Sequence, residues 1–276
     1  MIKCEALNKD FSTKEELFAA LKENKSDIIS LKKAQVQKSF EKGSSVKSRM
    51  LDISKHLETI KNLTLTTDCY YIVVNTTNIL DSHMDVHLKG IWNKTVQEQK
   101  GKNYLVVDHK LEVEKVVVRK EHVEMIIAEI PFSSIGKSYD GSTQALIYKV
   151  PKDKVKNEFI KEWLESKDEI EASVRMQYVK IELAMNSDDV NDKIEKANYD
   201  TYINEIANKD DFEEINYFFI VQEAKNITES SLVVAGSNSS TGIMNYKHQP
   251  SKDTVEIERA AAKALRTKEY FINLNS

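Results

Sequence analysis

The chain contains 276 residues, of which 41% are hydrophobic and 30% are charged, so it can bury a substantial hydrophobic core. A net charge of −4 argues against nucleic-acid binding by the chain as a whole, and no hydrophobic run approaches the roughly 20 residues that cross a bilayer. The start of the chain lacks the apolar region of a signal peptide, and Cys4 and Cys69 are too few for a disulfide framework. We therefore expect a cytoplasmic protein with free thiols that binds neither nucleic acid nor membrane.

The charge is distributed unevenly along the chain. Residues 1–65 contain 13 basic and 9 acidic residues and so carry +4, whereas residues 186–214 contain 10 acidic residues and 3 lysines and so carry −7. This segregation predicts two additions to a central body.

Two helices are predicted in the N-terminal stretch. Residues 12–15 (Ser-Thr-Lys-Glu) have the form of a capping box, and the hydrophobic residues Leu17, Phe18 and Leu21 follow it directly. A second helix is predicted over residues 46–60, separated from the first by residues 43–45 (Gly-Ser-Ser).

The centre of the chain changes from helical to strand periodicity at Cys69. Short β-branched and aromatic runs predict strands at residues 71–74, 104–107, 115–118 and 124–130. Pro151 is expected to open a helix, because hydrophobic residues then recur at three- and four-residue steps, at Val155, Phe159, Ile160, Trp163 and Leu164.

The remaining elements alternate between strand and helix. Ser173 lies on a predicted strand, on the more polar of its two faces. The acidic stretch is predicted to be a helical insertion, followed by strands at residues 215–220 and 231–235 and a terminal helix that includes residues 255–266.

Four short segments carry candidate chemistry, at residues 81–92, 107–109, 171–176 and 229–234. They place His109, Ser173 and the late acidic residue Glu229 on separate elements of a β-rich region. A serine hydroxyl is a weak nucleophile until a neighbouring base takes its proton, and a neutral histidine can do so near physiological pH. Only folding can bring these residues together.

The order of these segments resembles the prohead (capsid maturation) serine proteases of tailed phages, whose fold is related to the herpesvirus capsid assembly proteases. The resemblance runs from about residue 68 to residue 245. The chain departs from the family pattern at Met84, Lys110 and Arg175, where Gly, Asp and Gly are usual. The matching positions are Asp81, Asp85, Gly90 and Trp92, then His109, then Ser173 to Met176, then Glu229, Ser231, Leu232, Val233 and Asn238.

The resemblance implies an α+β fold, with a bent or closed antiparallel β-barrel surrounded by helices and a helical N-terminal extension. The expected domains are the extension at residues 1–65, a protease domain at 66–246 that contains the acidic insertion 186–214, and a C-terminal helix or tail at 247–276. The basic extension has two interpretations: a solvated appendage, or a segment that docks onto the scaffold or capsid shell.

The resemblance also implies a function, that of a serine endopeptidase that cleaves scaffold and major capsid protein extensions inside the assembling procapsid, in the host cytoplasm. Ser173 would attack the scissile carbonyl, His109 would act as general base and then acid, and Glu229 would orient His109. We therefore predict that His109 lies within hydrogen-bonding reach of Ser173 Oγ. His122 is the reserve candidate for the third position, and a homodimer is left open.

No cofactor is expected. Asp81, His83, Asp85 and His87 alternate, and on one strand they would share a face that could hold zinc. The two aspartates already match the family segment, however, and a polar solvent-facing strand explains the histidines.

Two alternative functions are retained. The first is a non-catalytic scaffold or capsid-associated protein of the same ancestry, for which Arg175 beside the serine segment is the main support. The second is an unrelated helical adaptor with a β domain. The presence of both His109 and Ser173 favours the enzyme over both alternatives.

Overall fold

The computed structural model describes residues 1–34, 51–52, 63–135, 137–166, 170–234, 236, 238 and 240–245. The described chain is a mixed α+β protein with several sheets, which confirms the predicted fold class at this level. Its helices are α1 (Lys14–Glu23), α2 (Lys25–Ala34), α3 (Asn93–Glu98), α4 (Glu158–Ser166) and α5 (Lys193–Tyr202).

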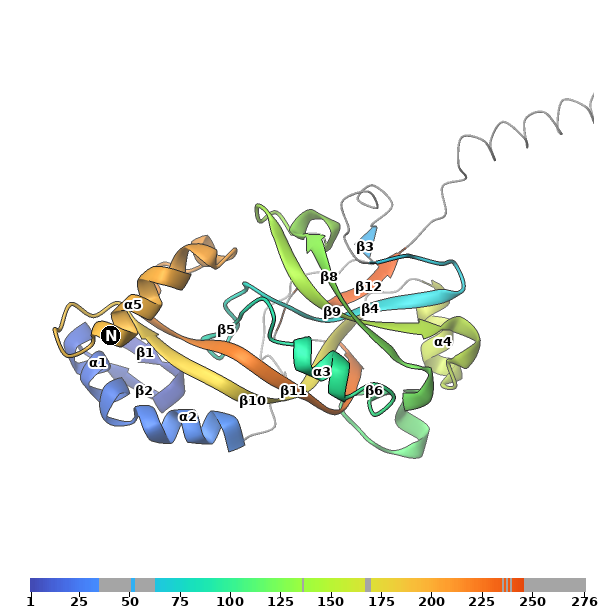
Figure 1. Ribbon diagram of the computed structural model, residues 1–276, viewed down its shortest axis with the longest axis horizontal. Coiled ribbons are helices and arrows are strands. Elements are labelled where there is room, and N and C mark those ends of the chain that lie inside the picture. The colour runs from blue at the N-terminus through green and yellow to red at the C-terminus, as the bar shows by residue number, and fades with distance from the viewer. Residues whose placement is uncertain are drawn as a thin grey trace, which may run out of the picture.

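The described strands form three sheets (Figure 1). A small N-terminal sheet pairs β1 (Ile2–Cys4) with β2 (Lys9–Phe11). The second sheet has the order β10 (Glu171–Met185), β11 (Tyr217–Val233), β6 (Tyr104–Val107) and β7 (Val116–Val118), with β5 (Asp85–His87) also paired to β11. The third has the order β3 (Leu51–Asp52), β12 (Gly242–Asn245), β4 (Cys69–Thr76), β9 (Ser142–Pro151) and β8 (Glu124–Pro131).

The described sheets do not close into a barrel, and they are not purely antiparallel. β11 pairs in parallel with both β5 and β6, and β12 pairs in parallel with β3. The closed antiparallel barrel that the family resemblance implied is therefore not found in the part of the chain that the structure describes.

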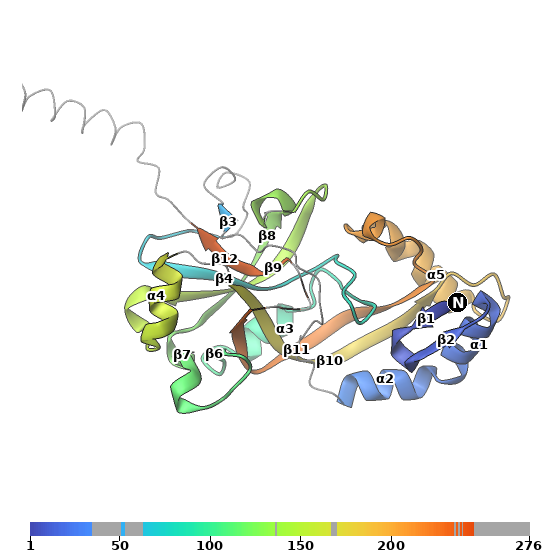
Figure 2. The same cartoon turned by 180° about the vertical axis from the view of Figure 1, so that it is seen from behind.

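The strands β10 and β11 form a long antiparallel ribbon that runs from the N-terminal elements to the body that contains β4, β8 and β9 (Figures 1 and 2). The sequence predicted two separate strands at residues 215–220 and 231–235, and that division is wrong. The polar residues between them pair with β10, so β11 continues from Tyr217 to Val233.

One hydrophobic cluster fills the space between the second and third sheets. Ala172, Val174, Met176 and Tyr178 alternate along β10 and point into this cluster, together with residues of β4, β9 and β11. Period-two alternation on β10 thus gives Ser173 and Arg175 the opposite face, as the sequence predicted.

The N-terminal segment belongs to the same cluster. Leu17 and Leu21 of α1 are fully buried, and Cys4 and Phe11 of the small sheet join them. The boundary near residue 65 stays a prediction, but the described residues before it share their core with the body that follows.

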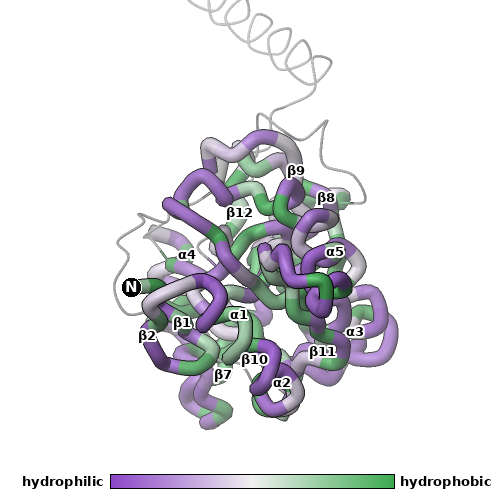
Figure 3. The backbone as a smooth tube through the Cα atoms, turned by 90° about the vertical axis from the view of Figure 1, so that its left-hand side faces the viewer, coloured by the Kyte–Doolittle hydropathy of each residue, from purple (hydrophilic) through white to green (hydrophobic). Residues whose placement is uncertain are grey.

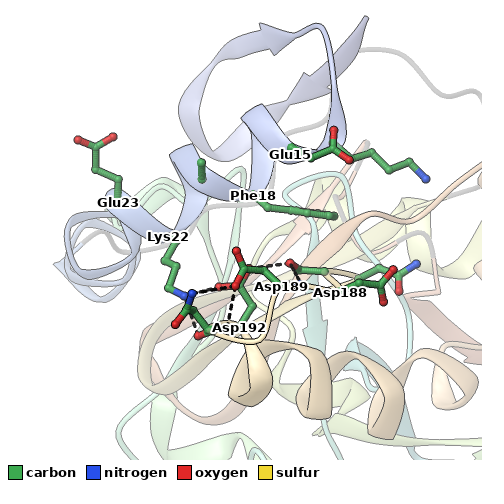
Figure 4. Close-up of a pocket in the computed structure, with 12 residues that line it drawn as sticks. Glu15, Phe18, Lys22, Glu23, Asp188, Asp189 and Asp192 are labelled. Atoms are coloured by element: carbon green, nitrogen blue, oxygen red, sulfur yellow. Dashed lines mark hydrogen bonds and ion pairs between the residues drawn. The ribbon is translucent and has the colours of Figure 1, made fainter.

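The basic N-terminal stretch and the acidic insertion contact each other directly, although the sequence predicted them only as separate additions. In Figure 4, Lys22 points from α1 toward Asp192, whereas Glu23 points away. Figure 3 views the molecule from the side that carries the N-terminus. Here α1, α2 and α5 lie around the ribbon of β10 and β11, and each of these helices contains both hydrophilic and hydrophobic residues. Three ion pairs join the two stretches, Lys14 with Glu214, Lys22 with Asp192 and Lys25 with Glu195.

Two of the predicted helices begin at later residues than predicted. The N-cap of α1 is Thr13, whose hydroxyl accepts from the Glu16 backbone N–H, while the Glu16 carboxylate accepts from the Ser12 backbone N–H. The N-cap is therefore Thr13, one residue later than in the predicted capping box, and the glutamate bonds to the residue before it. Pro151 ends β9, and α4 begins only at Glu158.

Leu51 and Asp52 form the strand β3, although the sequence predicted a helix over residues 46–60. The other residues of that predicted helix lie outside the described part of the chain, and so do residues 43–45 and the predicted C-terminal helix.

Candidate active site

Ser173 lies near the start of β10, directly opposite Ser231 of β11. It is 2% exposed, and its hydroxyl contacts His109. The strand fixes its direction, because its neighbours Ala172 and Val174 are anchored in the hydrophobic cluster on the other face.

His109 lies in a tight turn directly after β6. Asp108 and His109 have φ values of 51° and 55°, and the Lys110 N–H donates to the Val107 carbonyl over 3.0 Å. Two successive positive φ values closed by such a bond describe a type I′ turn, which is costly for residues other than glycine and is found mostly where the surroundings enforce it. The turn directs the imidazole toward β10 and β11.

Ser231 holds this turn in place. Its Oγ accepts the His109 backbone N–H over 2.7 Å and lies 3.3 Å from the Val106 carbonyl, to which it donates. A second bond runs from the Asp108 N–H to the Leu232 carbonyl over 3.1 Å. The strand β11 thus positions the backbone of the histidine as well as the carboxylate beside it.

Glu229 lies in an irregular part of β11. Ser230 pairs with Val174 and Asn226 pairs with Met176, so three residues of β11 face the single residue Arg175, and Thr228 has a φ of 67°. Such bulges bend a strand and redirect side chains next to functional sites. The Asn226 amide spans the bulge, because it donates to the carbonyls of Glu229 and Arg175 over 2.7 and 3.1 Å.

The three side chains meet in one buried hydrogen-bonded line. His109 Nδ1 lies 3.0 Å from Glu229 Oε1, and His109 Nε2 lies 2.9 Å from Ser173 Oγ. Since a carboxylate can only accept, Nδ1 carries the proton and Nε2 accepts from the serine hydroxyl. The predicted contact between His109 and Ser173 is therefore confirmed, and the tautomer is the one that a general base requires.

The site is shielded from water. Glu229 is fully buried and His109 is 8% exposed, so the charge of the carboxylate acts on the imidazole in a low-dielectric environment. His122, the reserve candidate for the third position, lies in the 3₁₀ turn Lys120–His122, and the group that contacts His109 Nδ1 is Glu229.

Arg175 is half-buried, two positions after Ser173. Its carbonyl accepts from Asn226, and its buried Nε has no hydrogen-bond partner in the described part of the chain. No hydrogen bond between its guanidinium and the three central side chains is present among the described residues.

A second buried histidine lies outside this cluster. The Asn75 amide donates to His87 Nδ1 over 3.0 Å, and His87 Nε2 then donates to the Tyr178 hydroxyl over 3.2 Å. Tyr178 donates to Asp85 Oδ2 over 2.9 Å, and Asp85 Oδ1 forms an ion pair with Lys32 of α2 at 2.6 Å. This Lys32–Asn75 network links α2 to β4, β5 and β10.

Burial shifts the protonation of this network. It lowers the pKa of His87 to about 4, because the charged imidazolium would lose its hydration. Burial, together with the nearby Asp85 carboxylate, raises the pKa of Asp81 to about 8, although two backbone N–H groups bonded to its Oδ1 act in the opposite direction. The network therefore favours a neutral histidine.

The four alternating residues considered as a zinc site do not share one strand. β5 starts at Asp85, and Asp81 and His83 precede it in a turn closed by a 3.1 Å bond from the Met84 N–H to the Asp81 carbonyl. Across the described ranges, no group of three or more His, Cys, Asp or Glu side chains is arranged to hold a metal ion.

Sequence reasoning missed two residues of the candidate site. Ser231 belongs to the segment that carries the resemblance, but its bond to the His109 backbone could not be inferred from its position. Asn226 gave no signal, since a polar residue in a strand is usually solvated.

No helix among the described residues is both long and apolar enough to span a membrane. Comparison with known proteins finds no family model, no curated protein and no solved structure that matches this chain.

Proposed function

We propose that the protein is a serine endopeptidase of the prohead protease type, which cleaves scaffold and capsid-protein extensions inside an assembling phage procapsid. The observation that carries the proposal is the continuous line from Glu229 through His109 to Ser173, with both imidazole nitrogens at hydrogen-bonding distance from their partners. The ordered segments that resemble the family supply the substrate class, and a bent or closed barrel remains the architecture that this resemblance implies.

In the proposed reaction, Ser173 Oγ attacks the carbonyl carbon of the scissile bond while its proton passes to His109 Nε2. Glu229 stabilises the imidazolium that forms and holds Nδ1 protonated. His109 then delivers the proton to the leaving amine, and the acyl-enzyme formed on Ser173 is hydrolysed by water with the same histidine as base. Ser231 keeps the histidine backbone in register with the serine throughout.

The test is cleavage of coexpressed scaffold and capsid proteins by the wild-type protein and by Ser173→Ala. The variant should abolish processing, since the loss of a serine nucleophile lowers kcat by up to about 10⁶-fold, while the fold persists because one small hydroxyl is removed. The control is Ser142→Ala, which removes a strand hydroxyl bonded to Glu129 far along the sequence from the triad. Equal processing by Ser173→Ala and the wild type would refute the proposal.

One observation favours a second candidate, the non-catalytic scaffold or capsid-associated protein of the same ancestry. Ser173 is 2% exposed, so a peptide must gain access to its hydroxyl before any reaction. Absence of processing by the wild-type protein, together with its incorporation into assembled particles, would select this alternative.

A further inference from the structure

We infer that Asn226 and Tyr148 are positioning residues of the triad, which act through the backbone of Glu229 and not by contact with the reacting atoms. This inference rests on the proposed endopeptidase function. His109, Ser173 and Glu229 all lie on or directly after strands of the second sheet, β6, β10 and β11. Tyr148 lies on β9 of the third sheet, so the inference gives the opposite side of the core a role in the triad.

Asn226 is fully buried, and both polar atoms of its side chain are engaged. Its Nδ2 carries two hydrogens, which donate to the carbonyls of Glu229 and Arg175 over 2.7 and 3.1 Å. Its Oδ1 has two lone pairs and accepts from the Tyr148 hydroxyl and from Asn103 Nδ2. An amide used in this way has one orientation, because a flip would set its oxygen against two carbonyls.

The groups that hold Asn226 are themselves fixed. Tyr148 is fully buried in the cluster between the second and third sheets, and burial raises the pKa of its hydroxyl, which therefore stays protonated and donates. Asn103 directly precedes β6, the strand that leads to the His109 turn. The Asn226 backbone N–H donates to Thr95 Oγ1 of α3 over 3.3 Å. One residue thus ties β11 to β6, β9 and α3.

The position of Glu229 depends on a backbone that is not a regular strand. Three residues of β11 face Arg175 in the bulge, and Thr228 holds a φ of 67°. A positive φ is costly for a residue other than glycine, and a bulge interrupts the ladder of hydrogen bonds that otherwise fixes a strand. The Asn226 amide supplies donors at this interruption. A slip of one residue would turn the Glu229 side chain to the opposite face.

The Glu229 carboxylate depends on this support. Within the described ranges, its hydrogen bonds are the two to His109 Nδ1, at 3.0 and 3.3 Å. The carboxylate can orient the imidazole only if its own backbone is held, since no other described side chain bonds to it. The carbonyl that Asn226 holds belongs to Glu229 itself, so the amide fixes the direction of the side chain.

The test measures kcat and KM on a peptide that spans a scaffold cleavage site, located by mass spectrometry of the processed scaffold. Asn226→Ala should lower kcat by about 100-fold at unchanged KM, since it releases the carboxylate that orients the base. Tyr148→Phe keeps the ring in the core, removes one donor to the amide and should lower kcat by about 10-fold. This second variant keeps the inference testable if Asn226→Ala does not fold.

A double-variant cycle separates positioning from a general loss of structure. If Asn226 acts through Glu229, Asn226→Ala should lower kcat by less than about 3-fold when Glu229→Gln is already present, because the interaction that it supports has gone. A second measurement needs no substrate. The downfield proton NMR signal of the hydrogen bond between His109 Nδ1 and the carboxylate should shift in Asn226→Ala and in Tyr148→Phe.

The matched controls are Asn208→Ala and Tyr71→Phe. Asn208 is a buried asparagine whose amide bonds to the backbone N–H and carbonyl of Leu80, over 2.8 and 2.9 Å. Tyr71 is a buried tyrosine of β4 whose hydroxyl accepts the Thr66 N–H over 2.8 Å. Both controls should keep the wild-type kcat and the NMR signal.

Equal kcat for Asn226→Ala, Tyr148→Phe and the wild type overturns the inference alone. An equal fall of kcat in the wild-type and Glu229→Gln backgrounds also overturns it, and so does the same loss in the controls. No cleavage by the wild type overturns the proposed function. The NMR signal then decides the inference by itself, and a signal that is unchanged in both variants overturns it.

Discussion

The two buried histidines among the described residues have similar exposure but different partners. His109 is 8% exposed and lies between the Glu229 carboxylate and the Ser173 hydroxyl, whereas His87 is 4% exposed and lies between the Asn75 amide and the Tyr178 hydroxyl. A carboxylate reaches His87 only through Tyr178, since Asp85 bonds to that hydroxyl. Burial is thus common to both histidines, and the direct carboxylate contact belongs to His109 alone.

The comparison shows that, at similar burial, the hydrogen-bond partners of a histidine decide which protonation state it can reach. A carboxylate in contact with Nδ1 stabilises the imidazolium, so His109 is equipped to take a proton from Ser173. The His87 partners are neutral, burial lowers its pKa to about 4, and its hydrogen bonds define a fixed neutral tautomer. We therefore expect changes around His109 to affect catalysis and changes around His87 to affect stability.

Among the residues bonded to the two histidines, apart from Ser173 itself, the largest effect is expected for Glu229→Gln. The amide cannot stabilise an imidazolium and can donate to Nδ1, which would place the histidine proton on Nε2 and remove the base, so kcat should fall by up to about 10⁴-fold with little change in KM. His109→Ala should lose more. The control Glu223→Gln changes a carboxylate of the same strand that pairs with Lys94 at the surface, and it should retain activity. A Glu229→Gln variant as active as the wild type would remove Glu229 from the proposed triad.

Lys32→Met should destabilise the protein without affecting the chemistry. It leaves the Asp85 carboxylate buried without its cation, which typically costs about 3–5 kcal/mol in the free energy of unfolding. The double variant Lys32→Met/Asp85→Asn should recover part of this loss in urea unfolding.

The matched control for this prediction is Lys22→Met. The Lys22 side chain is 40% exposed in its pair with Asp192, so its removal should cost at most about 1 kcal/mol. Equal losses for the two lysines would show that the Lys32–Asn75 network does not fix α2 to the body.

His87→Gln should change how stability depends on pH. The lowered pKa of His87 means that, from about pH 6.5 down to about pH 4, the unfolded chain binds a proton that the folded protein refuses, so His87 reduces stability as the pH falls. The raised pKa of Asp81 acts with the opposite sign over about pH 4 to 8, because there the folded protein binds the proton and stability falls as the pH rises.

Comparison of wild type and His87→Gln at each pH removes the contribution of Asp81. The advantage of the wild type in urea unfolding should shrink toward pH 4, with a slope of at most about 1.4 kcal/mol per pH unit. A constant difference from pH 4 to 7 would mean that His87 is not held neutral.

The smallest effect is expected for Ser231→Ala, which removes the acceptor of the His109 backbone N–H. The type I′ turn should then relax, and kcat should fall about 10-fold at unchanged KM, as expected for one lost hydrogen bond. Ser231→Thr keeps the hydroxyl and should restore most of the rate, and the neighbouring Ser230→Ala should have little effect. A change in KM alone would assign Ser231 to substrate binding instead.

Much of the secondary structure could be predicted from local pattern. β6 has the predicted bounds, Tyr104 to Val107, β4 and β8 cover two other predicted runs, and β7 begins one residue after the start of the fourth. β-branched residues bounded by polar turns are a local signal. Alternation around Ser173 also predicted its face. The local pattern does not predict β9, and Pro151 ends this strand instead of opening a helix.

The pairing of charged stretches could not be predicted from local pattern. The sequence shows a basic N-terminal stretch and an acidic insertion, but attraction between them is a long-range property of the fold. The three ion pairs between them, and the joining of α1 to the central cluster, depend on how the ribbon of β10 and β11 brings residue 22 close to residue 192.

The sequence by itself determined which residue types were available for the site, namely a histidine after one strand, a serine on another and a glutamate late in the chain. Only the tertiary structure decided that they meet. The parallel pairing of β6 with β11, the turn with two positive φ values and the bulge around Thr228 place His109 between its two partners. Its Nδ1 lies 3.0 Å from Glu229 Oε1, and its Nε2 lies 2.9 Å from Ser173 Oγ. None of these features has a local signature, because each depends on strand register, and register is set by the burial of whole faces across the core.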